Sequence, residues 1–145
     1  MSDALSSAVS KLRASSARLN QLTDDAAATV KEVEEFLSQE CSIGIPTYLC
    51  IHQATEEYEA SRHLAYRRIG STFRIALAWW RDGDPEDEFV KPWSDCSRDE
   101  KLESIKKLPD LLTEIARNVD HRIVASEKAV ESVSQALQSL TGKED

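Results

Sequence analysis

The sequence predicts an α+β fold in which two long heptad-patterned helices pack antiparallel, like a coiled coil, and flank a small antiparallel three-stranded β-meander. Two observations predict it. Apolar or small residues recur at alternating steps of three and four in two long segments, and apolar residues alternate with polar ones between those segments. A chain of 145 residues suits one domain with its own core. The expected order is a helix over 3–40, the β-meander over 43–81, an acidic loop over 82–96, a kinked helix over 97–140 and a polar tail over 141–145.

The first heptad repeat predicts one helix of about 55 Å, at 1.5 Å per residue. Its positions are Leu5, Val9, Leu12, Ser16, Leu19, Thr23, Ala26, Val30, Val33 and Leu37. Ser2 suits the N-cap, and Ser42 and Gly44 mark the point where the repeat ends. Thr23, which two aspartates follow, is an alternative start for a second helix. We favour one helix because the repeat passes through Thr23 unbroken.

The second heptad repeat predicts the C-terminal helix. Its positions are Leu102, Ile105, Pro109, Leu112, Ala116, Val119, Ile123, Ser126, Val130, Val133, Leu137 and Leu140. Ser97 and Glu100 have the spacing of a capping box, which marks the start. Pro109 lacks a backbone N–H, so we expect it to kink this helix or to begin a new one.

Both predicted helices attach to the same meander, so we expect them to fold back together, with the sheet at one end and both termini at the other. In that arrangement Val30 and Val133 lie at the centre of the buried seam, where an introduced charge destabilises the fold. Several seam positions are small or polar and bury little area. We therefore expect a homo-oligomer that covers the seams further.

A β-hairpin is predicted around Gly70-Ser71, because residues 63–69 and 72–80 on either side are rich in β-branched and aromatic side chains. A two-residue type II′ turn places Arg67 opposite Arg74. One face of the hairpin then carries the core residues Leu64, Tyr66, Phe73, Ile75, Leu77 and Trp79. A third strand is expected between Ile43 and Ile51, with Pro46 restricting its start.

The candidate binding site is the basic, aromatic segment 61–81, which contains five arginines and no acidic residue in an otherwise acidic chain. Two arginines that face each other repel unless an anion or a carboxylate lies between them. The segment therefore suggests a site for an acidic protein partner, a phosphate or nucleic acid, with tryptophans available for stacking. The candidate residues are Arg67, Arg74, Arg62, Arg68, His63, Trp79 and Trp80.

The alternative is that acidic residues before and after this segment neutralise it within the chain, at 56–59 and 82–88. If the arginines only form a solvated face, replacing Arg74 with Glu creates an opposite-charge pair with Arg67. That change should then stabilise the hairpin by roughly 0.2–1 kcal/mol.

No motif in the sequence indicates catalysis or a cofactor. The four glycines form no phosphate-binding loop, and neither a nucleophile elbow nor a zinc-protease motif occurs. Cys50 and His52 share a face of the predicted strand, with His63 or Cys96 as further ligands, but their spacing matches no zinc pattern. We therefore expect no enzyme, no cofactor and no metal.

Charge and cysteine content narrow the partners and the compartment. A net charge of −8 disfavours nucleic acid and anionic lipid as general partners. No apolar run approaches the roughly 20 residues of a membrane-spanning helix, and no secretory signal is visible. The three cysteines are an odd number, which suits reduced thiols and a cytoplasmic location.

The order of long helix, small β-meander and long helix resembles that of prefoldin subunits. The resemblance covers element order and carries over no functional residue. It implies an antiparallel coiled coil that holds unfolded chains at its helix tips, although the polar helix ends disfavour that role here. The leading hypothesis is a noncatalytic interaction or scaffold protein that self-associates through its seams and presents the hairpin to a partner. The alternatives are a prefoldin-like holdase chaperone and a module that binds an anionic ligand or nucleic acid.

Overall fold

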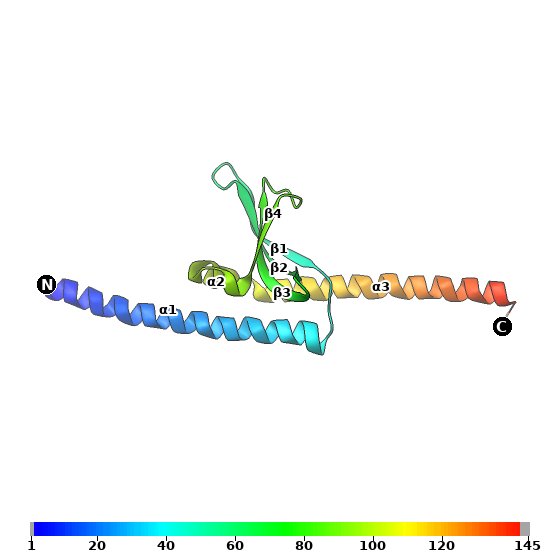
Figure 1. The fold of residues 1–145 in the computed structure, drawn as a ribbon, viewed down its shortest axis with the longest axis horizontal. Helices are drawn as coiled ribbons and strands as arrows, with labels where there is room; N and C mark the ends of the chain where they lie inside the picture. Colours follow the sequence, from blue (N-terminus) through cyan, green and yellow to red (C-terminus); the bar gives the residue numbers. More distant parts are fainter. Residues whose placement is uncertain (1, 143–145) are drawn as a thin grey trace.

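The computed structural model, which describes residues 2–142, contains two long helices and a four-stranded antiparallel sheet (Figure 1). In chain order the elements are α1 (Asp3–Glu35), a π-helical turn η1 (Phe36–Glu40), β1 (Thr47–His52), β2 (Ala60–Ile69), β3 (Thr72–Arg81), β4 (Glu88–Pro92), a 3-10 turn η2 (Trp93–Asp95), α2 (Arg98–Ile105) and α3 (Leu108–Thr141). The strand order is β1-β2-β3-β4, so each strand pairs with its neighbour in the chain. The fold is α+β, but the expected layout of two paired helices and three strands is wrong.

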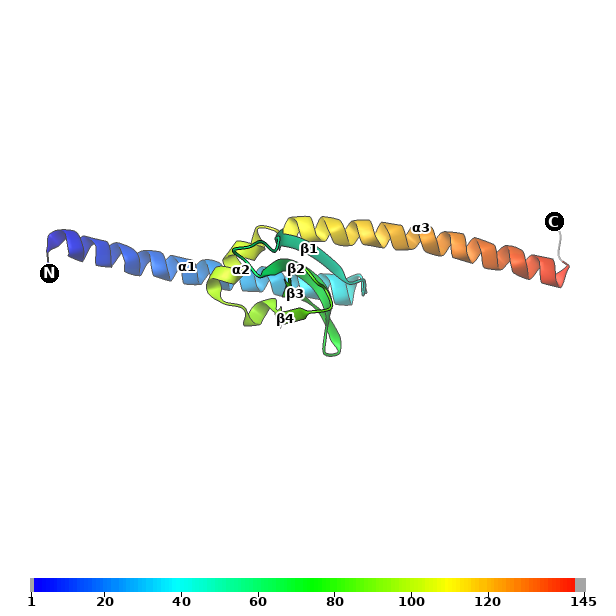
Figure 2. The same cartoon turned by 90° about the horizontal axis from the view of Figure 1, so that it is seen from above.

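The long helices do not form the expected antiparallel pair. Helix α1 approaches the sheet from one side and α3 leaves it on the other, so the N-terminal and C-terminal ends lie at opposite ends of an elongated molecule (Figures 1 and 2). Only the end of α1 and the beginning of α3 lie beside the sheet. The sheet offers both helices a large apolar face, whereas a seam with Ser16, Thr23 and Ser126 buries little area. The helices therefore pack on the sheet instead of on each other.

The fourth strand lies where an acidic loop over 82–96 was expected. Strand β4 pairs with β3, with Val90 opposite Ala78 and Pro92 opposite Ala76. The sequence of β4 predicts a strand only weakly, because the segment has five residues and begins with a glutamate and ends with a proline. The pairing with β3 therefore decides the conformation of this segment. Trp93, which follows it, is 1% exposed and belongs to the core.

The predicted β2–β3 hairpin is confirmed, register included. Arg67 pairs with Arg74 across the strands, Tyr66 with Ile75 and Leu64 with Leu77. Gly70 has a φ of +65°, and a type II′ turn requires a positive φ at its first central residue.

Helix boundaries follow the local signals in the sequence. Helix α1 runs unbroken through Thr23, whose hydroxyl donates to the Leu19 carbonyl 2.8 Å away instead of capping a new helix. The capping box of Ser97 and Glu100 starts α2, and Pro109 lies in the first turn of a separate helix, α3. That helix ends at Thr141, and residues 143–145 of the expected polar tail lie outside the described residues.

The core lies between one face of the sheet and the two helices. The sheet contributes Leu64, Tyr66, Ile75 and Leu77, α1 contributes Val30, its η1 extension contributes Leu37, and α3 contributes Leu108, Leu111 and Ile115. Val30 is 3% exposed, but it is buried in the core with the sheet and not in a seam between the long helices, whereas Val133 is 68% exposed. The expectation for Val133 within one chain is wrong because α3 has left the sheet before this residue.

Among residues 2–142, no helix combines the length and the hydropathy needed to cross a membrane.

Replacing Leu111 with Ala tests the core that α3 forms with the sheet. Leu111 is fully buried, so the free energy of unfolding should fall by roughly 2–5 kcal/mol in urea denaturation. The matched control is Leu112→Ala, which makes the same change one residue further on, at the partly buried edge of the core, and should cost less. Equal losses at the two leucines would contradict this placement of α3.

Candidate interaction site

Arg67 is neutralised within the chain. Its side chain forms an ion pair with Glu88 of β4, and its Nη1 also donates to the hydroxyl of Tyr48 at 3.1 Å. The side chain of Glu88 is 18% exposed, so this ion pair is partly shielded from water. Glu88 belongs to the acidic segment after the hairpin, as the alternative of internal neutralisation expected.

Arg74 faces Arg67 across the strands, but it is held by a different carboxylate. Its Nε donates to Oε2 of Glu34 on α1 at 3.4 Å, and its Nη2 donates to Oγ of Ser94 at 2.8 Å. The same Glu34 oxygen accepts the backbone N–H of Ile75 at 2.8 Å. The cross-strand repulsion is thus relieved by two separate carboxylates and needs no shared anion.

The face of the sheet opposite the core has its own aromatic cluster. The rings of His63 and Trp80 stack with centroids 3.8 Å apart, and Tyr48 lies 5.3 Å from Trp80. The indole of Trp80 donates to Oε2 of Glu88 at 2.6 Å, and Arg67 reaches the same carboxylate. Beneath the cluster are three fully buried alanines, Ala65, Ala76 and Ala78. Small side chains at these positions let the larger ones lie flat across the sheet.

His63 is the buried titratable residue of this cluster. It is 5% exposed, and its Nε2 lies 2.9 Å from the hydroxyl of Ser61. Burial lowers the pKa of His63 below its ordinary value, and the negative charge of Glu88 opposes that shift. The imidazole is therefore a neutral structural group at pH 7.

Arg62 and Trp79 lie on the core face, away from Trp80. The guanidinium of Arg62 sits 5.7 Å from the Trp79 ring centroid, and Lys91 is at the same distance. Arg62 also forms an ion pair at 3.5 Å with Glu103 of α2. A hydrogen bond from His52 holds the pKa of Glu103 below its usual value, and Arg62 adds to the effect.

The exposed aromatic surface surrounds Trp79. Phe89 is 59% exposed with its ring centroid 5.7 Å from that of Trp79, and Tyr58 is 60% exposed. A cleft of about 460 Å³ lies beside Trp79, between Tyr58 and Glu103. Phe89 was missed from the sequence because it lies in the segment that was expected to be a loop. This surface of Tyr58, Trp79 and Phe89 is called the aromatic patch below.

The seven candidate residues therefore do not form one site. Arg67, His63 and Trp80 belong to the cluster opposite the core, Trp79 belongs to the aromatic patch, and Arg62 lies beside Trp79. Arg74 joins α1 to β3. Arg68 lies near the hairpin turn, with its guanidinium 5.3 Å from the Phe73 ring centroid. The carboxylates that neutralise the arginines, Glu34, Glu88 and Glu103, come from three elements that only the fold brings together.

The residues weighed as metal ligands, Cys50, His52, His63 and Cys96, form no group of ligands. Within residues 2–142 no three His, Cys, Asp or Glu side chains come together as a metal site. The three cysteines are free thiols, with Cys41 and Cys50 exposed and Cys96 buried. Burial raises the pKa of Cys96 to about 11, which keeps that thiol protonated and unreactive.

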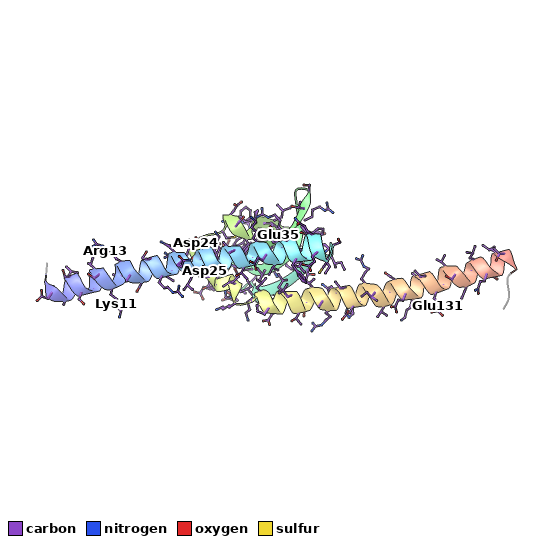
Figure 3. All side chains as sticks on the ribbon, turned by 90° about the horizontal axis from the view of Figure 1, so that it is seen from below. Lys11, Arg13, Asp24, Asp25, Glu35 and Glu131 are labelled. Carbon is purple, nitrogen blue, oxygen red and sulfur yellow. The ribbon has the colours of Figure 1, made fainter. Side chains whose placement is uncertain are left out.

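Most of the exposed large apolar side chains lie on two helical arms. We call residues 3–22 of α1 the N-terminal arm and residues 120–141 of α3 the C-terminal arm; every residue in them is exposed except the partly buried Val9. The exposed apolar side chains of the arms are Leu5, Leu12, Leu19, Leu22, Ile123, Val124, Val130, Val133, Leu137 and Leu140. Figure 3 shows Lys11, Arg13 and Glu131 on stretches of helix that no other element covers. The heptad stripe thus continues outward from the core onto uncovered helix.

Comparison with protein families, with curated proteins and with solved structures found no match.

Arg74→Glu tests the internal neutralisation. The hairpin alone predicted that this substitution stabilises the fold, whereas the structure predicts that it destabilises the fold. A glutamate at position 74 would lie beside Glu34 and would replace the cation that pairs with Glu34. We expect the free energy of unfolding to fall by roughly 1–3 kcal/mol. The control is Arg68→Glu, which replaces an exposed arginine near the turn. This variant should change the free energy of unfolding by less than about 0.5 kcal/mol. A stabilised Arg74→Glu variant would show that Glu34 does not hold this arginine.

The buried imidazole predicts how stability depends on pH. In the unfolded chain His63 takes up a proton near its ordinary pKa of about 6.5, whereas the folded chain binds it only at lower pH. The stability contribution of neutral His63 is therefore present above pH 6.5 and is lost as the pH falls through that value toward the folded pKa. Between pH 7 and pH 5 the wild type should lose more free energy of unfolding than His63→Gln. His121→Gln, which makes the same change at an exposed histidine, is the matched control.

Proposed function

We propose that this chain is a noncatalytic interaction or scaffold protein that self-associates through its two helical arms. The observation that carries the proposal is the placement of ten exposed large apolar side chains on the arms, eight of them in the register of the heptad repeats. A narrow apolar stripe of this period is the pattern of a helix that packs against another helix. Among residues 2–142 of one chain, no helix packs along the length of the arms.

Continuity of the stripe supports self-association. On α1 the repeat that places Val30 beneath the sheet also places Leu5, Leu12 and Leu19 on the uncovered arm. Isolated helices of this length are marginally stable in water, and monomers rarely expose extended apolar patches. A second copy of the chain offers stripes of the same period and length.

The sheet gives the assembly a second surface for a partner. In the aromatic patch Tyr58 and Phe89 are exposed and Trp79 is partly buried, while Arg68, at the other end of the hairpin, forms no ion pair with a described residue. We propose an acidic protein as the partner of this sheet surface. Aromatic side chains and arginine are enriched where proteins bind one another.

Two earlier alternatives have less support. The facing arginines suggested a site for phosphate or nucleic acid. Arg67, Arg74 and Arg62 instead pair with carboxylates of the chain itself, which reduces the support for such a site. A holdase role was implied by the prefoldin-like element order, which assumed helices folded back together. The three free thiols support a cytoplasmic location, which we include in the proposal.

Sedimentation equilibrium at micromolar concentration tests self-association. We expect a mass that is a multiple of the 16.2 kDa chain. Leu12→Asp should weaken the association roughly tenfold or more, because a seam position that is 68% exposed in one chain would bury a charge in the assembly.

The matched control is Ala14→Asp, which introduces the same charge on the opposite side of the arm. It should keep the wild-type mass, and circular dichroism should show that both variants retain the folded body. A wild type that sediments as a monomer, unchanged on dilution from high micromolar concentration, would refute the proposed function.

A further inference from the structure

We propose that the arms pair reciprocally: the N-terminal arm of one copy packs antiparallel against the C-terminal arm of a second copy, and the second pair of arms does the same at the other end. This arrangement rests on the proposed self-association and specifies its partner and its register. The N-terminal arm has about 20 residues and the C-terminal arm about 22, so they span about 30 Å and 33 Å. Neither arm would leave a long stretch of its partner uncovered.

The opposite directions of the arms allow both pairs to form at once. The arms leave the body on opposite sides, while α1 and α3 run in the same general direction (Figures 1 and 2). A two-fold axis perpendicular to the long axis therefore brings each N-terminal arm beside the partner's C-terminal arm, with the chains antiparallel. Such an interface is isologous and closed, which yields a dimer instead of an open fibre.

One register matches the seams of the two arms. It places Leu12 opposite Val130, and the flanking large apolar residues then meet as Leu5 with Leu137 and Leu19 with Ile123. The polar seam residue of each arm, Ser16 and Ser126, also meet, so neither faces a large apolar side chain.

The same register aligns the two bodies. Thr23 lies opposite Val119, and these are the seam positions at which each helix becomes partly covered by its own chain. In this register the two paired arms therefore become uncovered at the same pair of seam positions.

The net charges of the arms favour pairing of an N-terminal arm with a C-terminal arm over pairing of two N-terminal arms. The N-terminal arm has three basic residues and one acidic residue, in a chain with net charge −8, whereas the C-terminal arm has two basic and three acidic residues. Pairing two N-terminal arms would bring like net charges together. In the proposed register Arg13 flanks the seam opposite Glu127. Exposed pairs contribute little affinity, so this contact selects the orientation.

Disulfide trapping distinguishes reciprocal pairing from like-arm pairing, which a two-fold axis along the molecule would produce. The background carries Cys41→Ser and Cys50→Ser, which removes the exposed thiols and keeps the buried Cys96. Leu12→Cys and Val130→Cys are introduced singly and together, oxidised mildly and analysed on non-reducing gels, with peptide mass spectrometry of the linked positions. The double variant should form covalent dimers linked between positions 12 and 130, and neither single variant should.

The register has its own control. Leu12→Cys combined with Ile123→Cys shifts the second cysteine by one heptad and should not cross-link. Charge reversal gives an independent measurement: Arg13→Glu and Glu127→Arg should each raise the dissociation constant roughly 2- to 5-fold, and the double reversal should restore it.

The outcomes separate the two proposals. Covalent dimers from Leu12→Cys alone would overturn reciprocal pairing and leave self-association intact. A dimer by sedimentation that forms no link between positions 12 and 130 would overturn the register. A monomer by sedimentation would overturn the proposed function as well.

Discussion

The apolar face of the sheet is the constraint on which the rest of the structure depends. Leu64, Tyr66, Ile75 and Leu77 are almost fully buried there, and no single helix is wide enough to cover them all. The end of α1 covers the β3 side, and the first turns of α3 cover β1 and β2. Because both helices are needed on the sheet, their inner halves cannot form a two-helix coiled coil with each other. The separation of the arms follows from the width of the sheet.

The arginines join elements together in the folded chain. Arg74 ties β3 to α1 through Glu34, Arg62 ties β2 to α2 through Glu103, and Arg67 ties β2 to β4 through Glu88. Each pair connects segments that are distant in the sequence and partly shields its charges from water. Such partly covered ion pairs fix geometry more than they add stability. A chain with a net charge of −8 can supply a carboxylate for each of them.

Local patterns predicted the fold where the signals were local. The Gly70-Ser71 turn defined the hairpin register, the Ser97 and Glu100 capping box defined the start of α2, and the unbroken repeat predicted α1 through Thr23. Strand β4 could not be predicted because its pairing with β3 supplies most of the reason for its conformation. Heptad spacing identified the apolar stripe without identifying what covers it. The partner carboxylates of the arginines likewise depend on contacts between distant segments.

Under the proposed self-association, the uncovered arms would link the shape of the protein to its abundance. A helix of about twenty residues with no packing partner is only marginally stable in water, so an arm gains most of its order from the surface it packs on. When copies are scarce, the folded body would carry two fraying extensions that proteases can reach. When copies are plentiful, the same segments would become rigid and protected. In the proposed assembly, folding of the arms and association of the copies would be one equilibrium, and the concentration of the protein would set its position.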